Sequence, residues 1–319
     1  MNDHKISGVN MHDAYFKEVF SKKEYVSELL QSALPELSNS LDFESLKLEN
    51  TSYTDNELKS EFSDLVYSTK YGEEQIEIAL IFEHKSNEDK YVELQLLSYI
   101  QSAWNQNINQ KSDVVAVIPI IFHHGTKRLK LNLFDKLKKL PPELRKYQPL
   151  FEVETIDTTS LTSEEIVSIF RTAHLKLVMV VMKHIQTSPH KVLEELKRFG
   201  NIVIALKDTP NGINLLQTTI IYISKKPGIN METIVEKFAE IEQEVGEIAK
   251  SAWEIEFEKG IEKGIEKGIE KGIEKGKSEA KEEDAIRMLE HGISIELIEN
   301  ITGLSVKRIK ELQNRIIVS

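Results

Sequence analysis

A nearly unbroken apolar run at residues 113–125, "DVVAVIPIIFHHG", constrains the fold of this chain most. Such a run is typical of a β-strand buried on both faces, which occurs where helices cover both sides of a sheet. Residues 11–34 and 91–104 show helical spacing, and residues 62–86 read as two strands joined by a tight turn at Tyr71-Gly72. We therefore predict an α/β fold, a mixed sheet flanked by helices.

The composition excludes several classes of site. The 319 residues contain no cysteine, so a disulfide framework, a thiolate nucleophile and a zinc–cysteine site are all excluded. The run "LKLVMVVM" at 175–182 falls far short of the roughly 20 apolar residues that cross a bilayer, and the polar N-terminal stretch does not contain the apolar run that is typical of a signal peptide. We expect a cytoplasmic protein with no membrane contact.

The C-terminal half changes character along its length. Residues 160–245 read as helices, residues 259–276 repeat "KGIE", and the end has the proportions of a helix-turn-helix. Glycine every four residues costs a helix about 1 kcal/mol per position, so the repeat is either a semi-flexible helical spacer or a seam for self-association. We predict an α/β core at 1–158, a helical region packed on it at 159–250, a repeat helix at 251–281 and a small helical tail at 282–319.

The charge is unevenly distributed. A net charge of −11 argues against nucleic-acid binding by the chain as a whole, but residues 127–146 hold eight basic residues against two acidic ones. Each basic segment is either a solvated helical face or a nucleic-acid contact, and the tail is either a packing module or a DNA reader. The candidate DNA-binding residues are Lys127, Arg128, Lys130, Lys307, Arg308 and Lys310.

A possible reaction centre lies at the end of the strand "IEIALIFEHKS". Because side chains alternate along a strand, Glu83 and Lys85 share one face and His84, which we expect to be hydrogen-bonded, occupies the other. The hairpin brings Asp64 back toward Glu83. Two carboxylates and an ammonium suit phosphodiester hydrolysis with Mg²⁺ or another divalent cation, since Mg²⁺ prefers oxygen ligands and activates water. A surface salt bridge is the competing interpretation.

Several short motifs occur in a fixed order: "HDAYFKEVF", "SDLVYS", "LIFEHKSNEDK", "LQLLSYIQSAW" and "IPIIFHHG". Together they resemble the recombination-promoting nuclease (Rpn) family, also called a transposase family, of the PD-(D/E)XK nuclease superfamily. The resemblance covers about residues 1–250, and the glycine-repeat helix with a helix-turn-helix-like end is also familiar there. It implies a restriction-endonuclease-like core and metal-dependent cleavage of double-stranded DNA.

The resemblance also implies roles for individual residues. Asp64 and Glu83 would be metal ligands, Lys85 the catalytic lysine and Gln95 a polar active-site residue. Asp13 would be a further acidic ligand, or else an ordinary first-turn acid of its helix. Where the family often has glutamine, this chain has Lys85, which favours activity. The turn His123-His124-Gly125 reads as structural.

The sequence leaves several functions open. The first is a DNA endonuclease acting in recombination, mobile-element movement or defence. The second is a catalytically inactive module of the same fold that binds DNA or protein, and a transposase-related protein is a third. We also expect self-association through the C-terminal helices, and the resemblance suggests a short C-terminal product starting near Met231.

Overall fold

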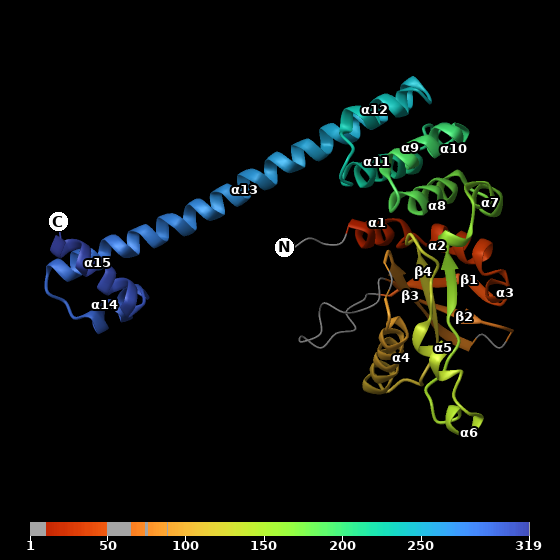
Figure 1. Cartoon of the computed structure of the whole chain (residues 1–319), viewed down its shortest axis with the longest axis horizontal. Helices are drawn as coiled ribbons and strands as arrows, with labels where there is room; N and C mark the ends of the chain where they lie inside the picture. The colour runs from red at the N-terminus through yellow and green to blue at the C-terminus, as the bar shows by residue number, and fades with distance from the viewer. Residues whose placement is uncertain (1–10, 50–64, 74–75, 88, 319) are drawn as a thin grey trace. The chain divides into compact units, whose positions relative to one another are not determined.

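The computed structural model describes residues 11–49, 65–73, 76–87 and 89–318. These residues belong to two compact units, Met1–Trp253 and Glu254–Ser319. In the first unit a sheet carries helices on both faces, as Figure 1 shows. The predicted α/β class is confirmed.

The sheet has five strands in the order β1-β2-β3-β4-β5. The first three strands are antiparallel neighbours, whereas β3, β4 and β5 run parallel. The mixed sheet therefore has β3 at its centre, and β3 carries the candidate site. The strands are β1 (Leu41–Leu48), β2 (Leu65–Tyr71), β3 (Ile76–Lys85), β4 (Ala116–His123) and β5 (Glu154–Asp157).

The predicted hairpin between β2 and β3 is confirmed. Gly72 has a φ of 69°, a left-handed conformation that glycine adopts without a steric penalty, and its N–H donates to the carbonyl of Ser40. From the turn the register runs without a break from Tyr71↔Ile76 to Leu65↔Phe82. The hairpin therefore brings the start of β2 to within one residue of Glu83.

The two faces of β3 meet different helices. Ile78, Leu80 and Phe82 enter the main core, which includes α1 (Met11–Phe20), α2 (Lys23–Ala33) and α8 (Ala173–Ile185). On the opposite face Ile81 packs with Val66 and Ile121 against α4 (Val92–Asn109). Each face of the strand end is thus built by different elements.

The helix α8 accounts for the apolar run at 175–182. Its side chains from Leu177 to Met182 are all buried in the main core. In the part of the chain that the structure describes, no helix combines the length and the apolar character needed to cross a membrane.

The other helices of this unit are α3 (Pro35–Ser38), α5 (Asn132–Leu137), α6 (Pro142–Arg145), the 3₁₀ helix η1 (Thr158–Ser160), α7 (Ser163–Ile169), α9 (Pro189–Arg198), α10 (Gly200–Ile204), α11 (Pro210–Ser224) and α12 (Met231–Ala239).

The repeat lies within one long helix, α13 (Gln243–Glu290). The repeat isoleucines are about half exposed, between 48% and 58%. In the second unit the end of α13 packs with α14 (Ile295–Thr302) and α15 (Val306–Val318) around Ala285, Ile298, Ile309 and Leu312. Gly292 and Gly303 follow α13 and α14 with positive φ, as expected for helix C-caps.

Candidate functional site

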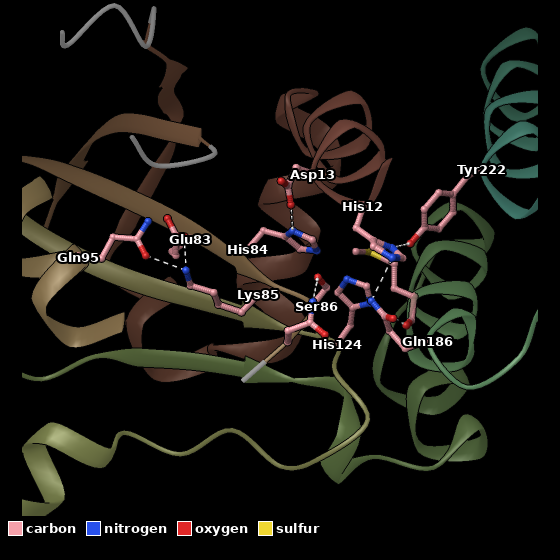
Figure 2. A network of polar contacts seen from close by, with 12 residues as sticks. His12, Asp13, Glu83, His84, Lys85, Ser86, Gln95, His124, Gln186 and Tyr222 are labelled. Atoms are coloured by element: carbon pink, nitrogen blue, oxygen red, sulfur yellow. Dashed lines mark hydrogen bonds and ion pairs between the residues drawn. The ribbon is translucent and has the colours of Figure 1, made fainter. Parts of the chain in front are cut away.

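The Lys85 ammonium is the centre of a polar cluster at the end of β3. It lies 2.9 Å from Glu83 Oε1, 3.0 Å from Asp89 Oδ2 and 2.7 Å from Gln95 Oε1. The Lys85 and Glu83 side chains are only 15% and 7% exposed. Figure 2 shows Lys85 directed toward Glu83 and Gln95. Three of the residues chosen from the sequence are therefore brought together, and the charges are too enclosed for an ordinary surface salt bridge.

Three elements position these side chains. Alternation along β3 places Glu83 and Lys85 on the face that meets α4, and Gln95 lies in the first turn of that helix. The Gln95 amide donates to the hydroxyl of Tyr99, one helical turn further along. Asp89 comes from the loop between β3 and α4 and accepts a hydrogen bond from the N–H of Tyr91.

Sequence reasoning missed Asp89 and Tyr99. Their signals are weak: Asp89 lies four residues after Lys85 but beyond the strand, and Tyr99 lies four residues after Gln95. The spacing of four indicates contact only inside a helix. It therefore could have identified Tyr99 but not Asp89.

Burial and charge act in opposite directions on Lys85. Burial alone would lower the pKa of Lys85, but the carboxylates of Glu83 and Asp89 outweigh it and raise the pKa above its ordinary value. Burial would raise the pKa of Asp89, yet the Tyr91 N–H and the Lys85 ammonium lower it. At neutral pH the cluster therefore holds an ammonium and ionised Asp89. Lys85 can donate hydrogen bonds to developing negative charge, but it is poorly suited to accept a proton from water.

The structure places Asp13 on the other face of β3. Its Oδ1 accepts a 2.8 Å hydrogen bond from Nδ1 of His84, whose side chain is fully buried. Figure 2 shows this pair directed away from Lys85 and Gln95. The hydrogen bond predicted for His84 is confirmed, while the metal-ligand role of Asp13 stays a prediction.

A cluster of three histidines stands behind the strand end. The ring of His84 stacks on that of His124 at 4.7 Å, and the ring of His12 meets His124 edge-on at 5.2 Å. The backbone N–H of His124 donates to the carbonyl of Lys85, and its Nδ1 donates to the carbonyl of Met182 in α8. The cluster therefore connects the helical region to the backbone that carries Glu83 and Lys85.

The six candidate DNA-binding residues separate into two groups. Lys127, Arg128 and Lys130 line a cavity of about 200 Å³ that Asp89 also lines. In the second unit Arg308 pairs with Glu282, at 2.8 and 2.9 Å, and with Glu311 at 2.9 Å. Lys307 and Lys310 are exposed on the same helix. The Arg308 charge is thus largely matched within its own unit.

Of the two carboxylates expected to bind a divalent cation, the structure describes only that of Glu83. Asp64 lies outside the described residues, although its chain neighbour Leu65 pairs with Phe82, the residue before Glu83. Within the described ranges, no group of three histidine or acidic side chains forms a metal cluster. Mg²⁺, however, commonly takes one or two carboxylates and completes its shell with water and phosphate oxygens. Glu83 together with Asp64 would meet that requirement.

Comparisons with known proteins identify relatives of this chain. A family model described as "Putative transposase, YhgA-like" matches residues 10–214. The recombination-promoting nuclease RpnD of Escherichia coli O157:H7 is 29% identical over 181 residues, which cover 55% of this chain and 68% of RpnD. RpnC of strain K12, also called a recombination-promoting nuclease, is 30% identical over 182 residues, 55% of this chain and 58% of RpnC.

Another relative is described differently. RpnE of strain K12, called an inactive recombination-promoting nuclease-like protein, is 28% identical over 180 residues, 55% of this chain and 58% of RpnE. No solved structure matches the chain. Because the family model spans more than half of its length, the chain belongs to the YhgA-like transposase family, together with the recombination-promoting nucleases.

Proposed function

We propose that this protein is a metal-dependent DNA endonuclease with a PD-(D/E)XK-type site at the end of β3. The observation that carries the proposal is the enclosed contact of Lys85 with Glu83, Asp89 and Gln95 at the end of the central strand of a mixed sheet. Enclosed charged groups whose pKa values are shifted by specific partners are concentrated at functional sites. The printed nuclease names of RpnD and RpnC support the same reaction class.

Each residue has a distinct part in the proposal. Glu83 and Asp64 would hold a divalent cation, and a cation bound there would lower the pKa of a bound water and polarise the phosphate. Lys85, kept protonated by its carboxylate neighbours, would donate hydrogen bonds to the phosphate oxygens as negative charge develops. Gln95 would orient the ammonium through its 2.7 Å hydrogen bond.

The test is nicking of supercoiled plasmid DNA in Mg²⁺ by the full chain. The variants are Asp64→Ala, Glu83→Gln and Lys85→Ala, and Lys250→Ala removes an exposed lysine as the matched control. We expect each site variant to be about 100-fold slower or more, as for the loss of a group that stabilises transition-state charge, and the control to cleave like the parent. Equal nicking by all variants would refute the proposal.

The inactive relative RpnE motivates one alternative, a DNA- or protein-binding module that has lost catalysis. It predicts that the parent does not cleave in Mg²⁺, Mn²⁺ or Co²⁺. A second readout separates metal binding from turnover: Ca²⁺ should raise the melting temperature of the parent but not of Glu83→Gln. A parent that neither cleaves nor responds to Ca²⁺ would contradict the nuclease proposal and favour the alternative.

A further inference from the structure

A second site adjoins the Lys85 cluster, at the turn that follows β4. The Cα of His123 pairs with that of Lys85, so the chain leaves β4 beside the end of β3. The residues after His123 enclose the cavity of about 200 Å³ with the segment that follows Lys85. Asp89 lines this cavity and also contacts the Lys85 ammonium. The cavity therefore shares a wall with the proposed reaction centre.

The turn is held in place by specific contacts. His123 is 2% exposed, and its Nε2 donates a 2.8 Å hydrogen bond to the carbonyl of Lys127. The N–H of Leu129 donates to Asp157 Oδ2 at 3.0 Å. At Gly125 a Cβ atom would lie 2.6 Å from the His123 ring, so only glycine fits beside it. The backbone that carries the basic side chains is thus preorganised.

The charge of the cavity favours an anion. Lys127, Arg128 and Lys130 line it, and all three side chains are exposed. Asp89 is the acidic residue of the lining, and its charge is offset by Lys85. Among the residues that the structure describes, the three basic side chains have no carboxylate partner. Even if Asp89 were counted against one of the three basic side chains instead of against Lys85, two positive charges would remain.

The wall also includes the buried ring of His123. His123 Nδ1 is buried and, within the described ranges, accepts and donates no hydrogen bond. Buried polar atoms are normally satisfied by protein, water or ligand. A cavity of about 200 Å³ lies below the roughly 300–1,000 Å³ of sites for drug-sized molecules. Its size suits a single phosphate group with water rather than a whole nucleotide.

We propose that this cavity binds one backbone phosphate of the DNA substrate, next to the phosphodiester that Lys85 faces. Arg128 would bind the phosphate oxygens through its planar fork, and Lys127 and Lys130 would act as point charges. His123 would be a positioning residue, because it holds the Lys127 backbone. The assignment of DNA as the source of the phosphate rests on the proposed nuclease function.

The test measures binding without turnover. A fluorescein-labelled 20-bp duplex is titrated with the full chain in EDTA, and anisotropy is recorded from about 50 to 200 mM salt. The variants are Lys127→Gln and Arg128→Gln, with Lys138→Gln as the matched control from the same basic segment outside the cavity. We expect about tenfold weaker binding for Arg128→Gln and a salt slope shallower by about one, with the control unchanged.

A second measurement separates DNA from free phosphate. Inorganic phosphate is added to the parent and to Arg128→Gln, and the melting temperature is recorded. Weaker DNA binding by the variant supports the proposal, whether or not free phosphate shifts the melting temperature. A phosphate-dependent shift with unchanged DNA binding would overturn the DNA assignment, and the absence of both effects would overturn the site. The binding titration contains EDTA and does not depend on cleavage. A parent that binds the duplex through this cavity but does not cleave DNA in Mg²⁺ would therefore refute only the proposed nuclease function.

Discussion

Acid should destabilise this protein through the buried histidine cluster behind β3. The Nε2 atom of His12 accepts a hydrogen bond from the side-chain amide of Gln186, and its Nδ1 donates one to the hydroxyl of Tyr222. The His12 ring also contacts the ring of His124. Burial, together with the charges of Lys226 and His84, lowers the pKa of His12 from 6.5 to about 4, although Asp13 acts in the other direction. Burial also lowers the pKa of His124, with His84 and His12 adding to the effect.

The sign follows from proton counting. The unfolded chain takes up protons on His12 below pH 6.5, whereas the folded chain does so only near pH 4. The folded state therefore has its full stability above about pH 6.5 and loses it as the pH falls toward 4. For these two pKa values the loss from His12 alone is about 2 kcal/mol at pH 5 and at most about 3.4 kcal/mol. His124 acts in the same direction.

The assay is urea denaturation of the parent and of His12→Asn at pH 7.5 and pH 5.0. Asparagine keeps a hydrogen-bonding side chain but cannot take up a proton, so the acid-induced loss should shrink by about 2 kcal/mol. His190→Asn, which replaces an exposed histidine, controls for the loss of an imidazole. If His12→Asn loses as much stability as the parent between the two pH values, the titration of His12 is not the cause.

Three further predictions concern stability. Gly125→Ala should lower the unfolding free energy by about 1–3 kcal/mol, because the new Cβ would lie 2.6 Å from His123 Cε1. Urea denaturation measures this loss, and a loss below about 0.5 kcal/mol would show that the His123 ring does not crowd the position. In α13, apart from the adjacent residues and the local helix backbone, no atom lies within 4 Å of a Cβ placed on Gly264. Gly264→Ala should therefore stabilise the helix by about 1 kcal/mol, seen as a later loss of helical circular dichroism on heating; an earlier loss would indicate a close neighbour. Glu28, buried in α2, accepts hydrogen bonds from the N–H groups of Arg171 and Thr172 and from the Thr172 hydroxyl. Glu28→Gln should therefore lower the unfolding free energy, measured by calorimetry, by about 1–3 kcal/mol. Glu24→Gln, at an exposed position of the same helix, should lower it little.

The fold was predictable where hydrophobic periodicity is strong. The apolar run before His123 and the alternation around Leu80 identified two neighbouring central strands, and Gly72 marked the turn of the hairpin. The edge strands β1 and β5 were missed. In β1, "LDFESLKL", six of the eight residues are partly or fully exposed, and the pairing register shifts between Asp42 and Lys47. The strand β5 has only four residues. Short or irregular edge strands lack a clear period of two.

The candidate site was predictable only along its strand. The period of two identified Glu83 and Lys85 as a pair, and the resemblance added Gln95. Asp89 depends on the path of a loop, and the histidine cluster depends on helices more than 50 residues away meeting β4, as in the contact of His124 with Met182. Neither leaves a local pattern in the sequence. Physical reasoning from one sequence therefore finds the residues of an element but not those that a fold brings to it.

The raised pKa of Lys85 favours a role as a hydrogen-bond donor to the phosphate over a role as the base that takes a proton from water, and the two roles can be told apart by experiment. A lysine that takes a proton from water needs a lowered pKa, whereas Glu83 and Asp89 raise that of Lys85. Arginine keeps the positive charge but cannot act as a base. Lys85→Arg should therefore retain more single-turnover cleavage than Lys85→Met, and the parent rate should not rise with the deprotonation of lysine as the pH approaches 10. Equal loss in both variants, with a parent rate that climbs tenfold per pH unit in alkali, would show that Lys85 acts as a base.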